Sequence, residues 1–140
     1  MLKISKHVIS SICTDICALP IENGGIIGRN KKGIITDYYF DYSSSRGFNQ
    51  YTPDTQKLNT VIRQWSEQKI EFCGIVHSHP MEIVNLSRAD IEYAVKVLNS
   101  FESLKYLYMI VVTPESKKSF LSTYKVFIDG ACKHERWSVF

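Results

Sequence analysis

Five polar residues carry side chains that could do chemistry together, and they are Glu22, His77, His79, Ser87 and Asp90. His77 and His79 lie two residues apart at the end of an apolar stretch, so on an extended backbone their imidazoles project to the same side. Asp90 follows His79 by eleven residues, and a loop of that length that begins with proline can return a helix N-terminus to the strand end. Two neutral imidazoles and one carboxylate are the usual ligands of a catalytic zinc ion, which keeps its fourth position for water. Nitrogen ligands favour zinc over magnesium or calcium, which prefer oxygen.

Each of these residues also has a purely structural interpretation. The two histidines can simply be exposed at a strand end, and Glu22 can be an ordinary surface carboxylate. Ser87 stands three residues before Asp90, which is the spacing of a capping box at a helix N-terminus. Cys73 lies four residues before His77, but it falls inside the apolar strand and is expected in the core. Taken singly, the structural interpretations are the more common ones; taken together, the spacing favours a metal site.

The apolar spacing of the chain predicts the elements that must position these residues. Apolar residues recur at helical spacing before Pro20, again around Trp65 and again after Ser87. Runs of apolar and β-branched residues between turn signals predict strands, and one of these runs leads directly into His77. The expected strands are 2–4, 21–28, 34–40, 72–76, 106–112 and 120–128, and the expected helices have their apolar faces over 8–16, 58–65 and 91–101. This mixture predicts an α+β or α/β fold.

Two segments beside the candidate site have distinctive compositions. Three glycines lie between residues 24 and 28, which indicates that another part of the backbone approaches closely there. The turn at residues 30–33 makes this segment the first half of a hairpin, with Glu22 near its entrance. The segment from Ser43 to Pro53 is polar and contains serine, glycine and proline, so we expect a surface loop of functional size.

The length and composition limit the possible classes of protein. With 140 residues, the chain is expected to be a single domain that spans residues 1–140. Hydrophobic residues make up 44% and charged residues 22%, which is typical of globular proteins and excludes disordered, collagen-like and coiled-coil chains. The net charge is only +3 and the basic residues are spread out, so nucleic acid is not expected as a partner.

The sequence shows neither the pattern of a membrane span nor that of a signal peptide. We therefore expect a cytoplasmic protein with no membrane partner. The four cysteines are accordingly expected to be reduced and mostly buried, and they are Cys13, Cys17, Cys73 and Cys132. Cys13 and Cys17 lie four residues apart and could supply half of a second metal site, but no matching Cys or His pair exists elsewhere. The core interpretation is therefore favoured for both.

The order and spacing of the polar residues resemble those of the JAMM (MPN+) zinc metalloprotease family, and in particular its compact prokaryotic JAB-type members. The sequence His77-Ser78-His79-Pro80, followed by Ser87 and Asp90, matches the His-x-His, Ser, Asp pattern of that family, and Glu22 supplies its upstream glutamate. The segments 22–28 and 74–76 are also similar to core strands of the prokaryotic members. The similarity covers about residues 5 to 128.

This resemblance implies a curved mixed β-sheet flanked by helices, of the cytidine-deaminase-like type, with zinc as the cofactor. His77, His79 and Asp90 would be the metal ligands. Glu22 would be the general base that takes a proton from the activated water, which would lie between it and the zinc ion. Ser87 would donate a hydrogen bond to the oxyanion of the tetrahedral intermediate.

The reaction that the resemblance implies is hydrolysis of a peptide or isopeptide bond. The chain has no long insertions of the kind with which eukaryotic deubiquitinating members grip ubiquitin chains. We therefore expect cleavage after the glycine-rich C-terminal tail of a small ubiquitin-like (β-grasp) protein, either a sulfur carrier or a modifier of a defence operon. Two alternatives stay open: a catalytically silent zinc-containing module that binds such a tail, and a general small-peptide metallopeptidase.

Overall fold

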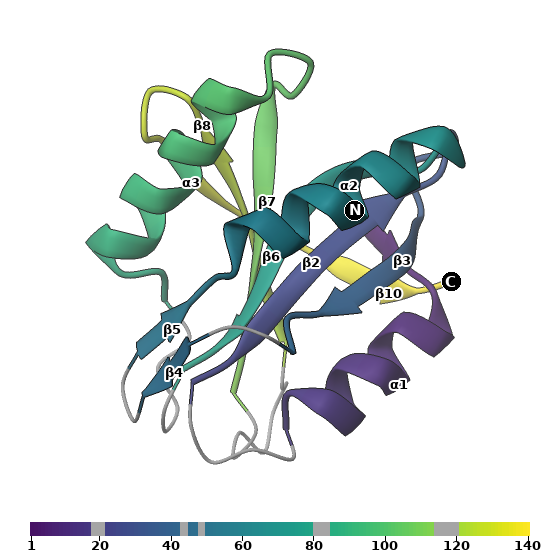
Figure 1. Cartoon of the computed structure of the whole chain (residues 1–140), viewed down its shortest axis with the longest axis horizontal. Coiled ribbons are helices and arrows are strands. Elements are labelled where there is room, and N and C mark those ends of the chain that lie inside the picture. Colours follow the sequence, from purple (N-terminus) through teal and green to yellow (C-terminus); the bar gives the residue numbers. More distant parts are fainter. Residues whose placement is uncertain (18–21, 43–44, 48–49, 80–84, 114–120) are drawn as a thin grey trace.

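Figure 1 shows the computed structural model of the chain, in which a mixed β-sheet carries helices on both faces. The structure describes residues 1–17, 22–42, 45–47, 50–79, 85–113 and 121–140. Its elements are β1 (Leu2–Ile4), α1 (Lys6–Asp15), β2 (Gly24–Arg29), β3 (Ile35–Phe40), β4 (Ser45–Gly47), β5 (Gln50–Thr52), α2 (Thr55–Glu67), β6 (Glu71–Ser78), α3 (Arg88–Ser100), β7 (Tyr106–Val112), β8 (Leu121–Phe127), β9 (Cys132–Glu135) and β10 (Trp137–Val139). No helix within these ranges is long and apolar enough to cross a membrane.

The large sheet has eight strands in the order β10-β1-β3-β2-β6-β7-β8-β9. In its centre, β2 lies antiparallel to both β3 and β6, and β6 lies parallel to β7. A parallel pair needs a crossover connection, and α3 lies in the connection from β6 to β7. Because this connection starts at the carboxyl end of β6, the N-terminus of α3 lies at the same end of the sheet. The fold therefore brings residues that follow β6 close to the first turn of α3.

Apolar side chains form one buried cluster on each face of the sheet. α1 packs on one face, for example through Ile12, and α2 and α3 pack on the other face, for example through Trp65 and Leu98. β6 contributes to both clusters, with Val76 on the side of α1 and Ile75 on the side of α2 and α3. Packing on both faces therefore fixes the strand that carries the histidines.

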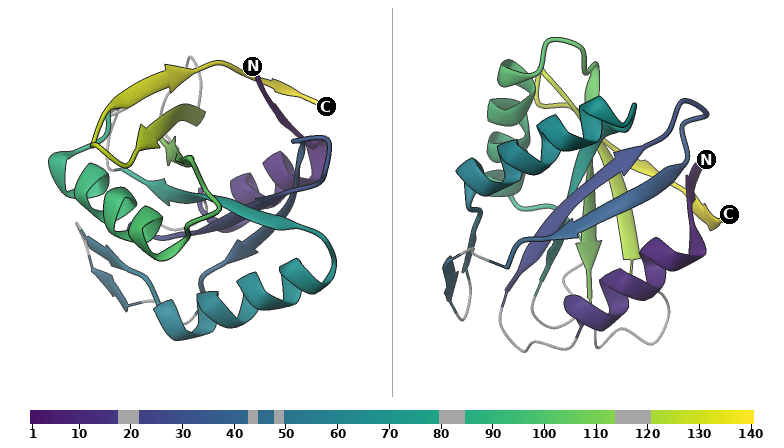
Figure 2. Two further views of the ribbon diagram at one scale, coloured as in Figure 1. Left: turned by 90° about the horizontal axis from the view of Figure 1, so that it is seen from above. Right: turned by 45° about the vertical axis from the view of Figure 1, so that its right-hand side comes forward.

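The last two strands draw the edges of the sheet together. β9 pairs with β8 at one edge and β10 pairs with β1 at the other edge, yet only Arg136 separates the two strands in the chain. One residue spans only a few ångströms, so the two edges must lie close to each other. The Leu2 N–H donates to the Arg136 carbonyl oxygen, and the indole N–H of Trp137 donates to the Leu121 carbonyl oxygen. The sheet is consequently strongly curved (Figure 2), and the predicted curved mixed sheet with flanking helices is confirmed.

Three expectations from the sequence need correction. The segment from Ser43 to Pro53 is more than a loop, because β4 and β5 pair in it as a short antiparallel hairpin; residues 43–44 and 48–49 lie outside the described residues. The segment after β8 forms two strands, β9 and β10, where none was predicted. The cysteines are not mostly buried, because only Cys73 is; all four are free thiols.

The glycines of β2 allow the close backbone approach that the sequence predicts. A Cβ atom at Gly25 would overlap the carbonyl oxygen of Tyr39 in β3. A Cβ atom at Gly28 would meet the side chains of Trp65 and Ile70. Glycine at these two positions therefore lets β2 lie tightly against β3 and beneath α2.

Replacement of Gly25 by alanine is expected to lower the free energy of unfolding by about 1–3 kcal/mol, because the added methyl group must push β3 away from β2. Urea denaturation followed by circular dichroism measures this change. Ser66→Ala, on the exposed side of α2, is the control and should change the free energy by less than about 0.5 kcal/mol. An unchanged value for Gly25→Ala would contradict the tight contact between β2 and β3.

Candidate metal centre

The carboxyl end of β6 carries both predicted histidine ligands. His77 pairs in register with Gly24 of β2 and with Val111 of β7, so its backbone is held from both sides. His79 follows directly after β6, and its N–H donates to the Val112 carbonyl oxygen at 2.9 Å. Both histidines are buried, with 6% and 8% of their surfaces exposed. Their backbone positions therefore depend on the two neighbouring strands.

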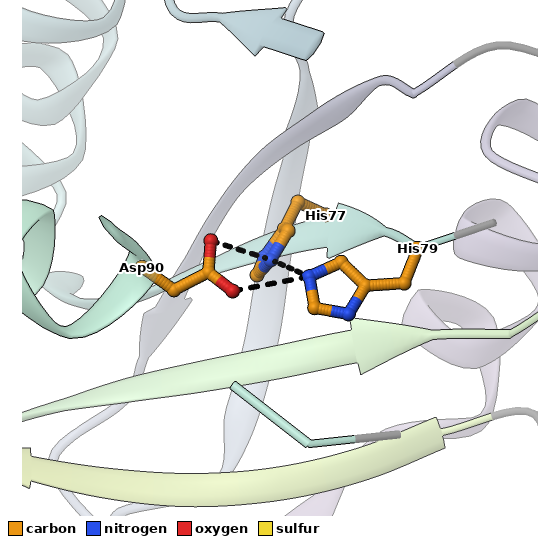
Figure 3. A group of neighbouring side chains, drawn as sticks. All are labelled: His77, His79 and Asp90. Carbon is orange, nitrogen blue, oxygen red and sulfur yellow. Dashed lines mark hydrogen bonds and ion pairs between the residues drawn. The ribbon is translucent and has the colours of Figure 1, made fainter. Parts of the chain in front are cut away.

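Asp90 reaches the histidines from the first turn of α3 (Figure 3). Its Oδ1 lies 3.3 Å from Nε2 of His77, and its Oδ2 lies 3.1 Å from Nε2 of His79. The two Nε2 atoms are 2.9 Å apart. One ligand atom from each of the three residues lies within 4.8 Å of the others. The structure thus brings together the three residues that are predicted to bind the metal.

The spacing of these atoms fits a tetrahedral zinc site. Ligand atoms at about 2.0–2.1 Å from a zinc ion lie about 3.3 Å from one another, and the shortest separations here are 2.9, 3.1 and 3.3 Å. In neutral imidazoles that carry their proton on Nδ1, both Nε2 atoms present lone pairs to the cluster, and the carboxylate adds a negative charge. A divalent cation would satisfy all three groups, and the two nitrogen ligands favour zinc.

The start of α3 holds the Asp90 carboxylate in place. Ser87 is the N-cap residue: its hydroxyl accepts a hydrogen bond from the Asp90 N–H at 3.1 Å, and its own N–H donates to Asp90 Oδ2 at 2.9 Å. The capping box that the sequence predicts is therefore confirmed. It does not compete with the cluster, because the same carboxylate still faces both histidines.

The surroundings of Asp90 favour its ionised form. Burial raises the pKa of the carboxyl, but in the metal-free chain, where each imidazole can carry a proton on Nε2, hydrogen bonds from His77 and His79 and from the Ser87 N–H outweigh burial and hold the pKa well below its usual range. A metal ion binds the deprotonated carboxylate, so this is the form that the centre requires.

Within the described ranges, no group bonds to the second ring nitrogen of His77. Its Nδ1 is buried and has no hydrogen-bond partner among the residues that the structure describes. Metal-binding histidines usually donate their other ring N–H to a carboxylate or to a carbonyl oxygen. The orientation of His77 therefore depends on the strand backbone and on its contacts with His79 and Asp90.

Glu22 lies at the entrance of β2, beside the cluster and not within it. The last paired residues at this end of the sheet are Gly24 of β2 and His77 of β6; Glu22 precedes Gly24 by two residues, and His79 follows β6 at the same end. The Glu22 side chain is half-buried. Within the described parts of the chain, no hydrogen bond or ion pair joins it to the three residues of the cluster. This position is compatible with a general base that reaches a water molecule and does not bind the metal.

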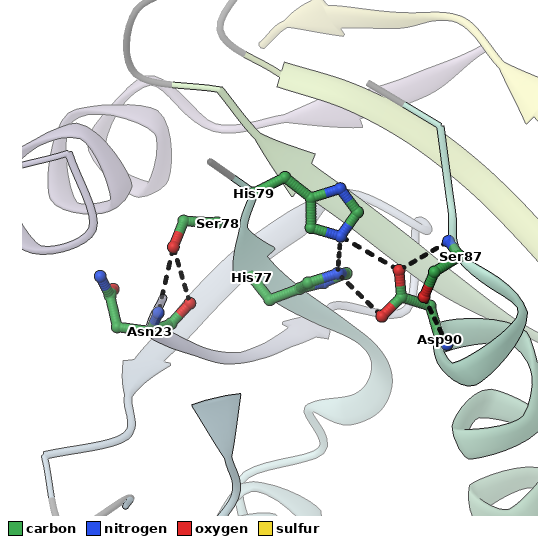
Figure 4. Close-up of polar contacts among 6 residues, drawn as sticks. All are labelled: Asn23, His77, Ser78, His79, Ser87 and Asp90. Atoms are coloured by element: carbon green, nitrogen blue, oxygen red, sulfur yellow. Dashed lines mark hydrogen bonds and ion pairs between the residues drawn. The ribbon is translucent and has the colours of Figure 1, made fainter. Parts of the chain in front are cut away.

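Two further residues of this region carry no signal in the sequence. Ser78 separates the two histidines and Asn23 follows Glu22; both are buried, and they are hydrogen-bonded to each other (Figure 4). They lie 55 residues apart in the chain. Only the register between β2 and β6 brings them together, and no local pattern reveals that register.

The fold and the cluster together define a JAMM-type domain with a candidate His-His-Asp metal centre. Residues 5–123 match the family described as prokaryotic homologs of the JAB domain. The chain therefore belongs to this family, and the family expected from the motif is confirmed. No curated protein is similar enough in sequence to match the chain.

Solved structures share the fold over nearly the whole chain. The solution structure of protein DSY2949 from Desulfitobacterium hafniense has a TM-score of 0.78 at 16% identity, and the match covers 100% of this chain and 93% of that one. The JAB1/MPN domain protein AF2198 from Archaeoglobus fulgidus has a TM-score of 0.61 at 17% identity, with 99% and 97% covered. A structure described as JAMM, a metalloprotease-like zinc site in the proteasome and signalosome, has a TM-score of 0.58 at 15% identity, with 100% and 98% covered. At these identities the likeness shows the fold alone.

The purified chain is expected to bind close to one zinc ion, with the metal content measured by mass spectrometry and the affinity by competition with a chelating indicator. His77→Ala and Asp90→Asn should each weaken zinc binding by more than about 100-fold, because the loss of a direct ligand should exceed that of an outer partner. Asn at position 90 keeps the shape, and its amide oxygen can still accept the hydrogen bond from the Ser87 N–H.

The exposed His134 in β9 offers a matched control, and His134→Ala should leave the zinc affinity unchanged. An Asp90→Asn protein that binds zinc as tightly as the wild type would remove Asp90 from the metal centre.

Proposed function

We propose that the chain is a zinc-dependent peptidase or isopeptidase that cuts the bond after the glycine-rich C-terminal tail of a ubiquitin-like protein. The observation that carries this proposal is the convergence of His77, His79 and Asp90 at the end of β6, with Glu22 two residues before the start of the paired strand β2. Membership of the JAB family supports it.

His77, His79 and Asp90 would hold the zinc ion, which when bound supplies a Lewis acid for the scissile carbonyl group and lowers the pKa of a water molecule. The Glu22 carboxylate would accept a proton from the attacking water. It would then deliver that proton to the leaving amine, so that one group serves as general base and later as general acid.

Ser87 would stabilise the negative charge that develops on the carbonyl oxygen. Its hydroxyl oxygen accepts a hydrogen bond from the Asp90 N–H, which leaves the hydroxyl proton for a further acceptor. Ser87 is exposed at the first turn of α3, next to the cluster. The cap therefore fixes the hydroxyl where it would donate to the oxyanion, so capping and catalysis use different parts of the same group.

The burial of the cluster supports a substrate that enters as a narrow chain. His77 and His79 are both buried, so a folded β-grasp protein cannot reach them with its body, whereas an extended tail of glycine residues can. The β4–β5 hairpin is a separate two-stranded sheet, so within the described residues each of its strands pairs with only one partner. An extended tail could add to such an edge through main-chain hydrogen bonds without needing side-chain pockets.

The partner that we propose is a β-grasp protein of the sulfur-carrier or modifier type, met in the cytoplasm. A gene for an activating enzyme, a conjugating enzyme or a sulfur carrier beside this one would separate these two classes of substrate.

Two other functions remain as alternatives. A silent module would bind zinc and the tail without turnover, but structural zinc is usually closed by a fourth protein ligand, whereas the cluster found among the described residues has three. A general small-peptide metallopeptidase would use the same chemistry without a β-grasp substrate. Turnover of a substrate would exclude the silent module. A preference for a glycine-rich tail over other peptides would exclude the general peptidase.

Glu22→Gln is expected to lower kcat by about 10²–10⁴-fold, because the amide keeps the shape of the side chain but cannot accept a proton. Zinc content and melting temperature should stay at their wild-type values. Glu67→Gln, on an exposed residue of α2, is the matched control and should not change kcat. Near-wild-type turnover in Glu22→Gln would eliminate Glu22 as the base.

Fusions of β-grasp proteins with intact Gly-Gly tails should be cut directly after the final glycine. Changing that glycine to leucine should lower kcat/KM by about 100-fold, since the bulky side chain displaces the scissile bond from the reacting groups. Product masses identify the cleavage position, and addition of a chelator should abolish cleavage. Equal cleavage of both tails, or cleavage of an unfolded protein at many positions, would favour the general peptidase instead.

A further inference from the structure

The last contact between β2 and β6 uses a side chain in place of a backbone group. Two residues that face each other in an antiparallel sheet can exchange two backbone hydrogen bonds. Beyond the Gly24–His77 pair, the Ser78 N–H donates to the Asn23 carbonyl oxygen at 2.9 Å, as in a regular sheet. The Asn23 N–H, however, donates to the hydroxyl oxygen of Ser78 at 3.0 Å (Figure 4). The hydroxyl thus takes over the role of a backbone acceptor.

The hydroxyl of Ser78 replaces the backbone acceptor at the point where β6 stops pairing with β2. The residue after Ser78 is His79, whose N–H bonds to Val112 of β7. The hydroxyl of Ser78 therefore keeps the end of β6 attached to β2, while the backbone continues beside β7 and brings His79 to the cluster. The same hydroxyl lies 3.4 Å from the Asn23 carbonyl oxygen, to which it donates.

Among the residues that the structure describes, Ser78 and Ile16 hold Asn23 at three points. Its N–H and its carbonyl oxygen both bond to Ser78, and its side-chain amide donates to the Ile16 carbonyl oxygen at the end of α1, at 3.4 Å. None of its surface is exposed. Glu22 directly precedes Asn23 in the chain. The hydrogen bonds of Asn23 therefore also restrict where the backbone of Glu22 can lie.

We propose that Ser78 is a positioning residue, whose hydroxyl group fixes Asn23 and thereby holds Glu22 in register with the two histidines. This inference rests on the proposed function, because it assigns Glu22 the role of the base. Loss of the hydroxyl would leave the buried N–H of Asn23 without its acceptor, and such a group is costly enough to make the strand end move toward a new partner. A shift of about 1 Å in a reacting group can lower a rate by about 100-fold.

The test compares Ser78→Ala, Ser78→Thr and Thr123→Val as zinc-loaded full-length chains. Thr retains the hydroxyl at position 78. Thr123 is a matched control, because it is also buried and its hydroxyl donates to the Glu135 carbonyl oxygen at the other side of the sheet. Three quantities are measured: the hydrogen-exchange rate of the Asn23 amide by NMR, the dissociation constant for zinc, and kcat and KM on a Gly-Gly fusion.

Ser78→Ala should speed exchange of the Asn23 amide by more than about tenfold and lower kcat by about 10–100-fold. KM and the zinc dissociation constant should change by less than about threefold, because the metal ligands keep their own contacts. Ser78→Thr should restore exchange and kcat, and Thr123→Val should lower the melting temperature without changing kcat. If Ser78→Ala does not fold, Ser78→Cys replaces it in the test, because the thiol is a weaker acceptor. It should also speed exchange of the Asn23 amide and lower kcat, but by smaller factors.

Three outcomes would overturn the inference. If the wild type cuts the tail and Ser78→Ala and Thr123→Val have the same kcat, the Ser78 hydroxyl has no positioning role, although the proposed function stands. If zinc affinity falls as much as kcat, Ser78 holds the ligands and not Glu22. A wild-type chain that binds zinc but cuts no tail would overturn the proposed function, and the positioning role with it.

Discussion

The antiparallel pairing of β2 with β6 is the constraint on which the rest of the structure depends. Glu22 precedes β2 and the two histidines lie at the end of β6, which is the same end of this antiparallel pair, so a slip of the register by one residue would turn the side chains of one strand to the opposite face. Packing on both faces of the sheet and the close approach at Gly25 hold the pair in place. The positions of the two histidines are therefore a consequence of strand register, to which the first turn of α3 adds Asp90.

The sequence predicted the parts of the molecule that repeat a local pattern. Helices with an apolar face and strands of six or seven residues carry enough periodicity to be located, and the His-x-His spacing already implied that both rings share one side. Among the short strands, β1 was predicted from its apolar residues Leu2 and Ile4, whereas β4, β5, β9 and β10 were not. Asn23 and Ser78 could not be predicted either, because a serine and an asparagine far apart in the chain gain meaning only from the register that joins them. The exposure of Cys13 likewise depends on how α1 packs against the sheet.

The capping box shows how one carboxylate can serve the fold and the site together. An N-cap contributes about 1 kcal/mol to a helix, and here the cap bonds orient Asp90 through the backbone of Ser87 and through its own N–H. The metal ligand is thus oriented by interactions that belong to the helix. Binding energy at the centre need not be used to order the side chain, which is the general advantage of a preorganised site.

The fold does not depend on the metal centre in the way that a small zinc domain does. In zinc fingers, apparent binding free energies of about 10–16 kcal/mol provide the folding free energy, because those domains have little core. This chain buries an apolar cluster on each face of its sheet, and the histidines stand at the end of a strand that both clusters already fix. A JAB domain can therefore lose its ligands and keep its fold. Under the proposed function, the difference between an active and a silent member would then lie in a few polar atoms at the end of β6 and in the position of Glu22 before β2.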